Sequence, residues 1–138
     1  MIKKLDHIAI AVKDLDEGIK TFVEKLGFQL KGIEEVEDQG VKTAFLSTEN
    51  GEHIELVCPT SANSPVANFL EKRGPGLHHI AFEVSAPLEN AIQDLLEKEV
   101  PMIDKSPKIG ANNKKIAFLH PKGTQGVLFE ICRPNQQT

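Results

Sequence analysis

Hydrophobic and polar residues alternate along two short segments of the chain, HIAIAV at 7–12 and HIAFEV at 79–84. A period of two over such a length is typical of a half-buried β-strand. Each segment is followed by apolar residues spaced three or four positions apart, within 14–28 and within 87–101. That spacing predicts a helix after each strand. The succession of strand and helix therefore occurs twice.

The repetition continues beyond the predicted helices. TAFL at 43–46 matches IAFL at 116–119, and HIELVCP at 53–59 matches LFEICRP at 128–134. Further strands are expected at FQLKGIEEVE, VKTAFLST and EHIELVC in the first half, and at MIDKSP, KKIAFLH and GVLFEIC in the second. A duplicated βαβββ module accounts for both halves.

The predicted class is α+β, with two tandem βαβββ modules that form a cupped mixed sheet. We expect module 1 at about 4–59, a linker with a short helix at about 60–76, and module 2 at about 77–134, together making one domain of 138 residues. Asp14 is the expected N-cap of the first helix and Gly27 its stop, while Ser64 and Pro65 begin the linker helix.

The composition narrows the possible partners. A net charge of −4 and a pI near 5.7 argue against nucleic acid, because phosphate binding favours a basic surface. No apolar stretch approaches the length of a membrane span, and charged residues follow MIKKLDHIAIAV too closely for a signal peptide. Cys58 and Cys132 lack CxxC spacing, so reduced packing thiols in a soluble, cytoplasmic protein are expected.

The alternation predicts which face of the sheet carries the candidate functional residues. Isoleucine and valine side chains point toward the helices, whereas the residues between them take the opposite face. The matched residues on that opposite face are His7, Glu55, His79 and Glu130. Two imidazoles and two carboxylates from four strands form a ligand set for a divalent metal ion, and Co, Zn, Mn, Ni and Mg all suit it.

Three other histidines are interpreted differently. His79 repeats His7, whereas the adjacent His78 corresponds to Asp6 and is expected to be a polar residue that faces solvent or the neighbouring module. His53 has no histidine counterpart and is interpreted as peripheral. His120, at a strand end before a Pro-Lys pair, is either a turn residue or a loop residue that contacts the ligand.

Two long stretches, SPVANFLEKRGPGLHHIAFEV and KIGANNKKIAFLHPKGTQGVLFEI, carry a more specific likeness. With the HIA…E pattern they resemble the vicinal oxygen chelate superfamily (glyoxalases, extradiol dioxygenases and bleomycin-resistance proteins), and within it the methylmalonyl-CoA epimerase family. The resemblance covers nearly the whole chain. It implies the paired-module fold around one metal ion per subunit, a homodimer, and epimerisation of an acyl-CoA substrate, methylmalonyl-CoA.

The family's metal ligands fall on His7, Glu55, His79 and Glu130, so the resemblance supports the same site. It also implies catalytic roles for Glu130 and Glu55, because inverting a stereocentre needs an acid and a base on opposite faces. Some family members use a glutamate where this chain has Thr43, and Glu55 is the expected substitute.

For the CoA portion, the resembling segments suggest contacts from Lys108, Gly110, His120 and Lys122, although a solvated loop is the simpler interpretation for any single lysine. Other functions of the same fold are a lactoylglutathione lyase, an extradiol dioxygenase and a metal-free small-molecule-binding resistance protein. A dioxygenase fits less well because it uses two histidines and one carboxylate, and a metal-free protein has no use for both His–Glu pairs. Relatives that act on ethylmalonyl-CoA or another 2-substituted acyl-CoA also stay open.

Overall fold

The computed structural model describes residues 1–135, which divide into two compact units. The first, here called the His7 unit, comprises His7–His78. The second, the His79 unit, joins Met1–Asp6 to the chain from His79 onward. Strand β1 (Ile2–Ala11) contributes to both units, because the division falls between Asp6 and His7.

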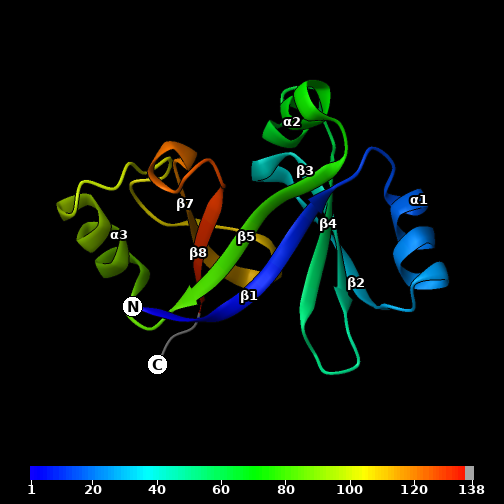
Figure 1. Ribbon diagram of the computed structural model, residues 1–138, viewed down its shortest axis with the longest axis horizontal. Coiled ribbons are helices and arrows are strands. Elements are labelled where there is room, and N and C mark those ends of the chain that lie inside the picture. Colours follow the sequence, from blue (N-terminus) through cyan, green and yellow to red (C-terminus); the bar gives the residue numbers. More distant parts are fainter. Residues whose placement is uncertain (136–138) are drawn as a thin grey trace. The chain divides into compact units, whose positions relative to one another are not determined.

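The His7 unit is built on a mixed sheet with the strand order β2-β3-β4-β1 (Figure 1). Strand β4 runs parallel to β1 and antiparallel to β3, which is antiparallel to β2. The bounds of these strands are β2 Gln29–Val36, β3 Val41–Ser47 and β4 His53–Pro59. The three strands predicted after the first helix are therefore confirmed.

The first helix follows β1 and has two parts. Helix α1 (Leu15–Ile19) continues into a π-helix at Lys20–Lys25. The Asp14 carboxylate accepts a hydrogen bond from the Glu17 N–H at 3.1 Å, which confirms the predicted N-cap. Gly27 follows the helix with φ +90°, a conformation that glycine adopts without steric cost.

The core of the His7 unit lies between this helix and the sheet. Val12, Leu15, Ala44, Leu46 and Leu56 are its buried members, and Ile10, Ile54 and the helical Ile19 and Phe22 pack against them. This confirms that the isoleucine faces of β1 and β4 point toward the helix. A second helix, α2 (Pro65–Arg73), is capped by Ser64, whose hydroxyl accepts from the Val66 N–H as predicted.

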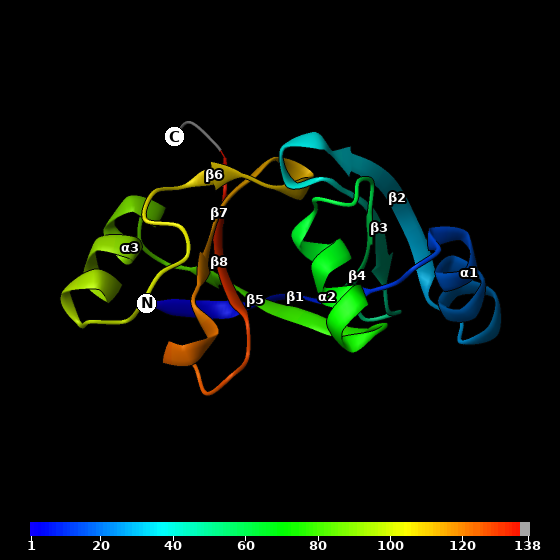
Figure 2. The same cartoon turned by 90° about the horizontal axis from the view of Figure 1, so that it is seen from above.

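The His79 unit repeats the plan with the strand order β5-β8-β7-β6 (Figures 1 and 2). Strand β8 is parallel to β5 and antiparallel to β7. Helix α3 (Leu88–Glu97) covers one face, where Leu88, Ala91 and Ile92 pack on strand residues such as Val84, Ala117 and Ile131. The bounds of the strands are β5 Gly76–Val84, β6 Lys108–Ile109, β7 Lys114–Leu119 and β8 Phe129–Pro134.

Short 3₁₀ turns complete both units, at Glu37–Gln39, Ala111–Asn113 and Pro121–Gly123. Two of the turns flank β7.

The prediction of a strand at MIDKSP is wrong. Met102 makes only an isolated bridge to Leu119, and the next residues turn away as a loop. The Ile103 and Asp104 N–H groups both donate to the Phe118 carbonyl, at 2.9 and 3.2 Å, while the Asp104 carboxylate accepts from the Phe118 N–H. A side chain thus takes the place of a backbone partner in the ladder, and Pro107 supplies no N–H to extend it.

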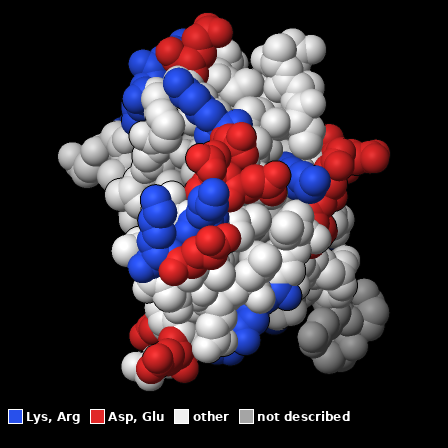
Figure 3. Space-filling view, turned by 90° about the vertical axis from the view of Figure 1, so that its right-hand side faces the viewer, with Lys and Arg blue, Asp and Glu red and all other residues white. Residues whose placement is uncertain are grey.

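The surface offers charges of both signs. On the face drawn in Figure 3, Lys and Arg side chains are interspersed with Asp and Glu side chains rather than gathered into a patch of one sign. Within residues 1–135, each helix is too short or too polar to span a bilayer.

Candidate metal and catalytic site

The His7 unit holds its histidine and glutamate against each other on the face of the sheet opposite the helix. The His7 Nδ1 lies 3.3 Å from the Glu55 Oε2, and both side chains are nearly buried. In the parallel pairing of β1 with β4, Glu55 lies opposite Ala9, which is fully buried. The small alanine leaves room for the Glu55 side chain to reach His7, two residues earlier on the same face.

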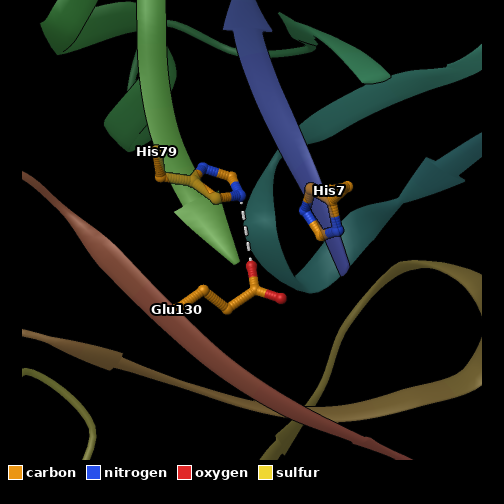
Figure 4. A group of neighbouring side chains, drawn as sticks. All are labelled: His7, His79 and Glu130. Carbon is orange, nitrogen blue, oxygen red and sulfur yellow. Dashed lines mark ion pairs between the residues drawn. The ribbon is translucent and has the colours of Figure 1, made fainter. Parts of the chain in front are cut away.

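The His79 unit has the same arrangement. The His79 Nε2 lies 3.2 Å from the Glu130 Oε1, and Figure 4 shows the glutamate on β8 directed toward the imidazole on β5. Glu130 lies opposite Ala81, again a fully buried alanine two residues after the histidine. The sequence repeat therefore produces a repeated His–Glu pair, with the same residue types at equivalent registers.

Each pair fits the chemistry of a metal half-site. Nitrogen and oxygen ligands lie about 2.1 Å from a bound transition-metal ion, so neighbouring donors on one ion are separated by about 3.0–3.4 Å. The donor separations of 3.3 and 3.2 Å in the two pairs match this range. Burial also suits the role, because buried carboxylates need a cationic or hydrogen-bonding partner.

A third polar pair in the His79 unit was not singled out from the sequence. The Lys114 ammonium contacts the buried Asp6 carboxylate, and the two residues are 108 positions apart. Cys132 lies nearby with no exposed surface. Burial raises the pKa of its thiol, and the negative charges of Asp6 and Glu130 raise that pKa further. The thiol is therefore protonated and inert at neutral pH.

The remaining histidines occupy separate places. The His78 ring lies edge-on to Phe69 of α2, with 5.0 Å between ring centroids. His53 is exposed. The His120 Nδ1 accepts from the Lys122 N–H at 3.1 Å, so this histidine caps the 3₁₀ turn, one of the two roles left open for it.

The residues suggested for CoA binding have structural roles of their own. Lys108 pairs with Asp104 at 3.2 Å, and its ammonium lies 5.2 Å from the centre of the Phe118 ring. Gly110 packs so closely on Ile116 that a Cβ at this position would lie 2.7 Å from the Ile116 Cδ1. Lys122 is exposed in its turn.

Thr43 is buried on β3 and lies opposite Glu34 of β2. Directly opposed residues of antiparallel strands share a face, so Glu34 and Thr43 point the same way. The next residue on that face of β3, Phe45, lies opposite Glu55. Glu34 thus adds a carboxylate to the face that carries Glu55. The sequence alone does not predict that Glu34 and Glu55 share a face, because this depends on the register between β2 and β3.

A shallow hollow of about 340 Å³ lies elsewhere in the His7 unit, between residues 26–28 and the turn at 48–52. Its lining includes Glu49 and Glu52 but no histidine and none of the predicted site residues. The hollow is therefore separate from the His–Glu chemistry.

The fold defines a class of proteins built from repeated βαβββ modules. The model of the Glyoxalase/Bleomycin resistance protein/Dioxygenase superfamily matches residues 6–118, and the chain belongs to this superfamily.

More specific likeness comes from single proteins. The ethylmalonyl-CoA/methylmalonyl-CoA epimerase of Cereibacter sphaeroides is 40% identical over 134 residues, which cover 95% of this chain and 98% of that protein. The structure of methylmalonyl-CoA epimerase from Mycobacterium tuberculosis is similar with a TM-score of 0.91 at 36% identity, and the match covers 96% of this chain and 89% of that one. A methylmalonyl-CoA epimerase solved with methylmalonyl-CoA and NH4+ matches with a TM-score of 0.89 at 34% identity, covering 97% and 96%. Within the superfamily the chain groups with the methylmalonyl-CoA epimerases, and the predicted glyoxalase-type fold is confirmed.

Proposed function

We propose that this chain is a metal-dependent acyl-CoA epimerase that interconverts (R)- and (S)-methylmalonyl-CoA. The observation that carries the proposal is the pair of buried His–Glu half-sites, 3.3 and 3.2 Å across, at equivalent positions of the two repeats. The relatives at 34–40% identity, one of them solved with methylmalonyl-CoA, support the substrate. The hydrogen at C2 of this substrate is acidic because C2 lies between a carboxylate and a thioester.

The ligands we propose for one divalent ion are His7, Glu55, His79 and Glu130. The duplication supports this set, because each repeat supplies one imidazole and one carboxylate. Co²⁺, Zn²⁺, Mn²⁺, Ni²⁺ and Mg²⁺ all accept such donors. When bound, the ion would act as a Lewis acid toward the thioester and carboxylate oxygens of the substrate.

Epimerisation moves a proton from one face of C2 to the other, which needs two proton-carrying groups. We assign these roles to Glu130 and Glu55, because they are the carboxylates of the two repeats and both are largely buried. One removes the C2 proton, the charge spreads into the thioester carbonyl, and the other returns a proton to the opposite face. Threonine at position 43 cannot act as a base at neutral pH, so we assign the second role to Glu55.

The CoA portion is proposed to contact Lys108, Gly110, His120 and Lys122. Lys108 and Lys122 supply positive charge for phosphate groups, and the ammonium of Lys108 is partly exposed although it is paired with Asp104. The close packing of Gly110 and the capping role of His120 keep the two loops beside β7 in fixed conformations.

We further propose a homodimer that works in the cytoplasm. Large apolar side chains on the surface, among them Leu26, Ile33 and Leu77, offer area for a subunit contact. Cys58 and Cys132 are both free thiols, as suits a reducing compartment. Light scattering of the purified protein measures the subunit number directly.

Site-directed variants test the assignment of the two glutamates. Starting from one epimer of methylmalonyl-CoA, Glu130→Gln and Glu55→Gln should each lower the rate of epimerisation by at least about 100-fold, because each removes one proton carrier. Glu34→Gln is the matched control, since Glu34 is a carboxylate on the same face of the His7 unit as Glu55. Full turnover by Glu55→Gln would refute the role of Glu55. A loss in Glu34→Gln instead would transfer the role to Glu34.

A lactoylglutathione lyase is the alternative with the same ligands. The likeness to epimerases does not favour it. Turnover of the hemithioacetal of methylglyoxal and glutathione, with none of methylmalonyl-CoA, would replace the proposal. Parallel assays with ethylmalonyl-CoA define the substrate range, since one relative is named for both substrates.

A further inference from the structure

Phe118 lies beside the His–Glu pair of the His79 unit and is held there by its main chain. On β7 it is opposite Glu130 of β8. Its N–H donates to the Asp104 carboxylate at 2.8 Å, and its carbonyl accepts from the N–H groups of Ile103 and Asp104. Both main-chain groups therefore point away from β8. Phe118 and Glu130 thus form a non-hydrogen-bonded pair, the kind in which opposed side chains approach most closely.

The Phe118 ring joins the histidine of the site to a charged pair in the loop. The ring centroids of Phe118 and His79 are 5.2 Å apart at an interplanar angle of 88°, which is an edge-to-face contact. The Lys108 ammonium lies 5.2 Å from the centre of the same ring, in the range of a cation–π interaction. Lys108 is in turn held by Asp104 at 3.2 Å. Asp104 thus holds Phe118 in two ways. Its carboxylate accepts from the Phe118 N–H, and it pairs with Lys108, whose ammonium contacts the Phe118 ring.

We propose that Phe118 is a positioning residue for His79, and that Asp104 and Lys108 fix the Phe118 ring for this purpose. The inference rests on the proposed function, because it treats His79 as a ligand. Glu130 contacts one imidazole nitrogen at 3.2 Å. The perpendicular Phe118 ring adds a contact to the imidazole ring itself, and this contact fixes the plane in which the nitrogen lone pair points. Contacts behind a ligand commonly change metal affinity 10–100-fold when they are lost.

The test compares Phe118→Leu with two other variants. Phe118→Tyr keeps the aromatic ring and should give the same His79 NMR result and Co²⁺ affinity as the wild type. Phe82→Leu is the matched control, because Phe82 lies on β5 of the same unit but stacks on Phe129, with 5.7 Å between centroids. Both leucine variants lose a partly buried ring, so both should lower the melting temperature.

Two readouts separate positioning from general stability. In the metal-free protein, NMR relaxation of the His79 ring carbons, whose signals are assigned with a His79→Gln variant, should show a more mobile imidazole in Phe118→Leu but not in Phe82→Leu or Phe118→Tyr. Titration with Co²⁺, followed by its visible absorption, should show affinity about 10-fold weaker in Phe118→Leu and within about twofold of wild type in the other two. A His79 ring mobility and a Co²⁺ affinity in Phe118→Leu that match those of Phe82→Leu would overturn the proposal.

The two proposals fail in different ways. A wild-type protein that binds no Co²⁺ refutes the proposed metal site, while the mobility of the His79 ring in the metal-free protein still decides whether Phe118 positions this ring. If Phe118→Leu does not fold, Asp104→Ala makes the same test, because it removes the carboxylate that accepts from the Phe118 N–H and pairs with Lys108. Its control is Asp94→Ala, which breaks the exposed Asp94–Lys98 pair of α3 and should leave the His79 ring mobility unchanged.

Discussion

Gly110 offers a quantitative test of the packing in the His79 unit. Its φ and ψ of −108° and −161° are extended, so an alanine at this position meets no backbone strain. The cost is steric, because an added Cβ would lie 2.7 Å from the Ile116 Cδ1 and 3.0 and 3.1 Å from its Cγ2 and Cγ1. Carbon atoms in favourable contact are about 3.5–4.0 Å apart. Ile116 is itself buried and has little room to move.

The expected loss follows from overpacking, which costs about 1–3 kcal/mol in a well-packed core. For 138 residues at about 2.1 cal/mol/K each, 1 kcal/mol corresponds to a shift of about 3 °C in melting temperature. Gly110→Ala should therefore lower the melting temperature by about 3–10 °C. Gly32→Ala is the control, because nothing lies within 4 Å of its added Cβ and its φ is negative. It should be neutral or slightly stabilising.

A second substitution identifies the clash. Ile116→Val removes the Cδ1 that makes the shortest contact, and alone it should cost about 0.5–1.5 kcal/mol. Combined with Gly110→Ala, it should cost about 1 kcal/mol less than the sum of the two single changes, because the clash is partly relieved. Urea unfolding of the four proteins measures this coupling. Strictly additive losses, or an unchanged stability of Gly110→Ala, would refute the reasoning.

Three other predictions follow from single contacts. Ser64→Ala removes the hydroxyl that accepts from the Val66 N–H at 3.1 Å and should cost about 1 kcal/mol in urea unfolding; unchanged stability would contradict the cap. A thiol reagent at pH 8 should modify Cys58 before the fully buried Cys132, whose thiol pKa is raised by burial, and equal rates in the native protein would contradict this. Lys115 lowers the pKa of Glu89 below its usual 4.5 through a 2.7 Å contact, so this stabilisation is present above pH 4.5 and lost as pH falls further. The melting temperatures of wild type and Lys115→Met should therefore differ less in acid than at neutral pH, and a difference that stays constant as the pH falls would contradict the pairing.

The sequence repeat and its local patterns predicted the features that depend on neighbouring residues, namely the helix caps and the faces of the strands. The helix caps at Asp14 and Ser64 depend on two or three neighbouring residues, and both are confirmed. Period-two alternation placed Glu55 and Glu130 on the face opposite the helices. Because the registers bring each glutamate opposite a buried alanine, the two His–Glu contacts follow from the same pattern.

Long-range pairing explains what the sequence did not predict. MIDKSP was expected to be a strand because it occupies the position of one in the first repeat. The structure instead uses the Asp104 side chain as a partner for Phe118, and no local pattern indicates that bond. The pairing of Asp6 with Lys114 joins residues 108 positions apart. The π-helix at Lys20–Lys25 is also absent from the sequence prediction, since its apolar spacing is that of an ordinary helix.

Hydrogen exchange at C2 of methylmalonyl-CoA tests the central claim most directly. The wild-type protein, loaded with Co²⁺ or stripped with EDTA, is incubated in D₂O with a single epimer, and both deuterium uptake and stereochemical purity are followed. The account predicts uptake accompanied by loss of stereochemical purity in the metal-loaded protein, and neither in the stripped one. Metal-loaded protein that binds one ion per subunit but leaves C2 unexchanged would contradict it.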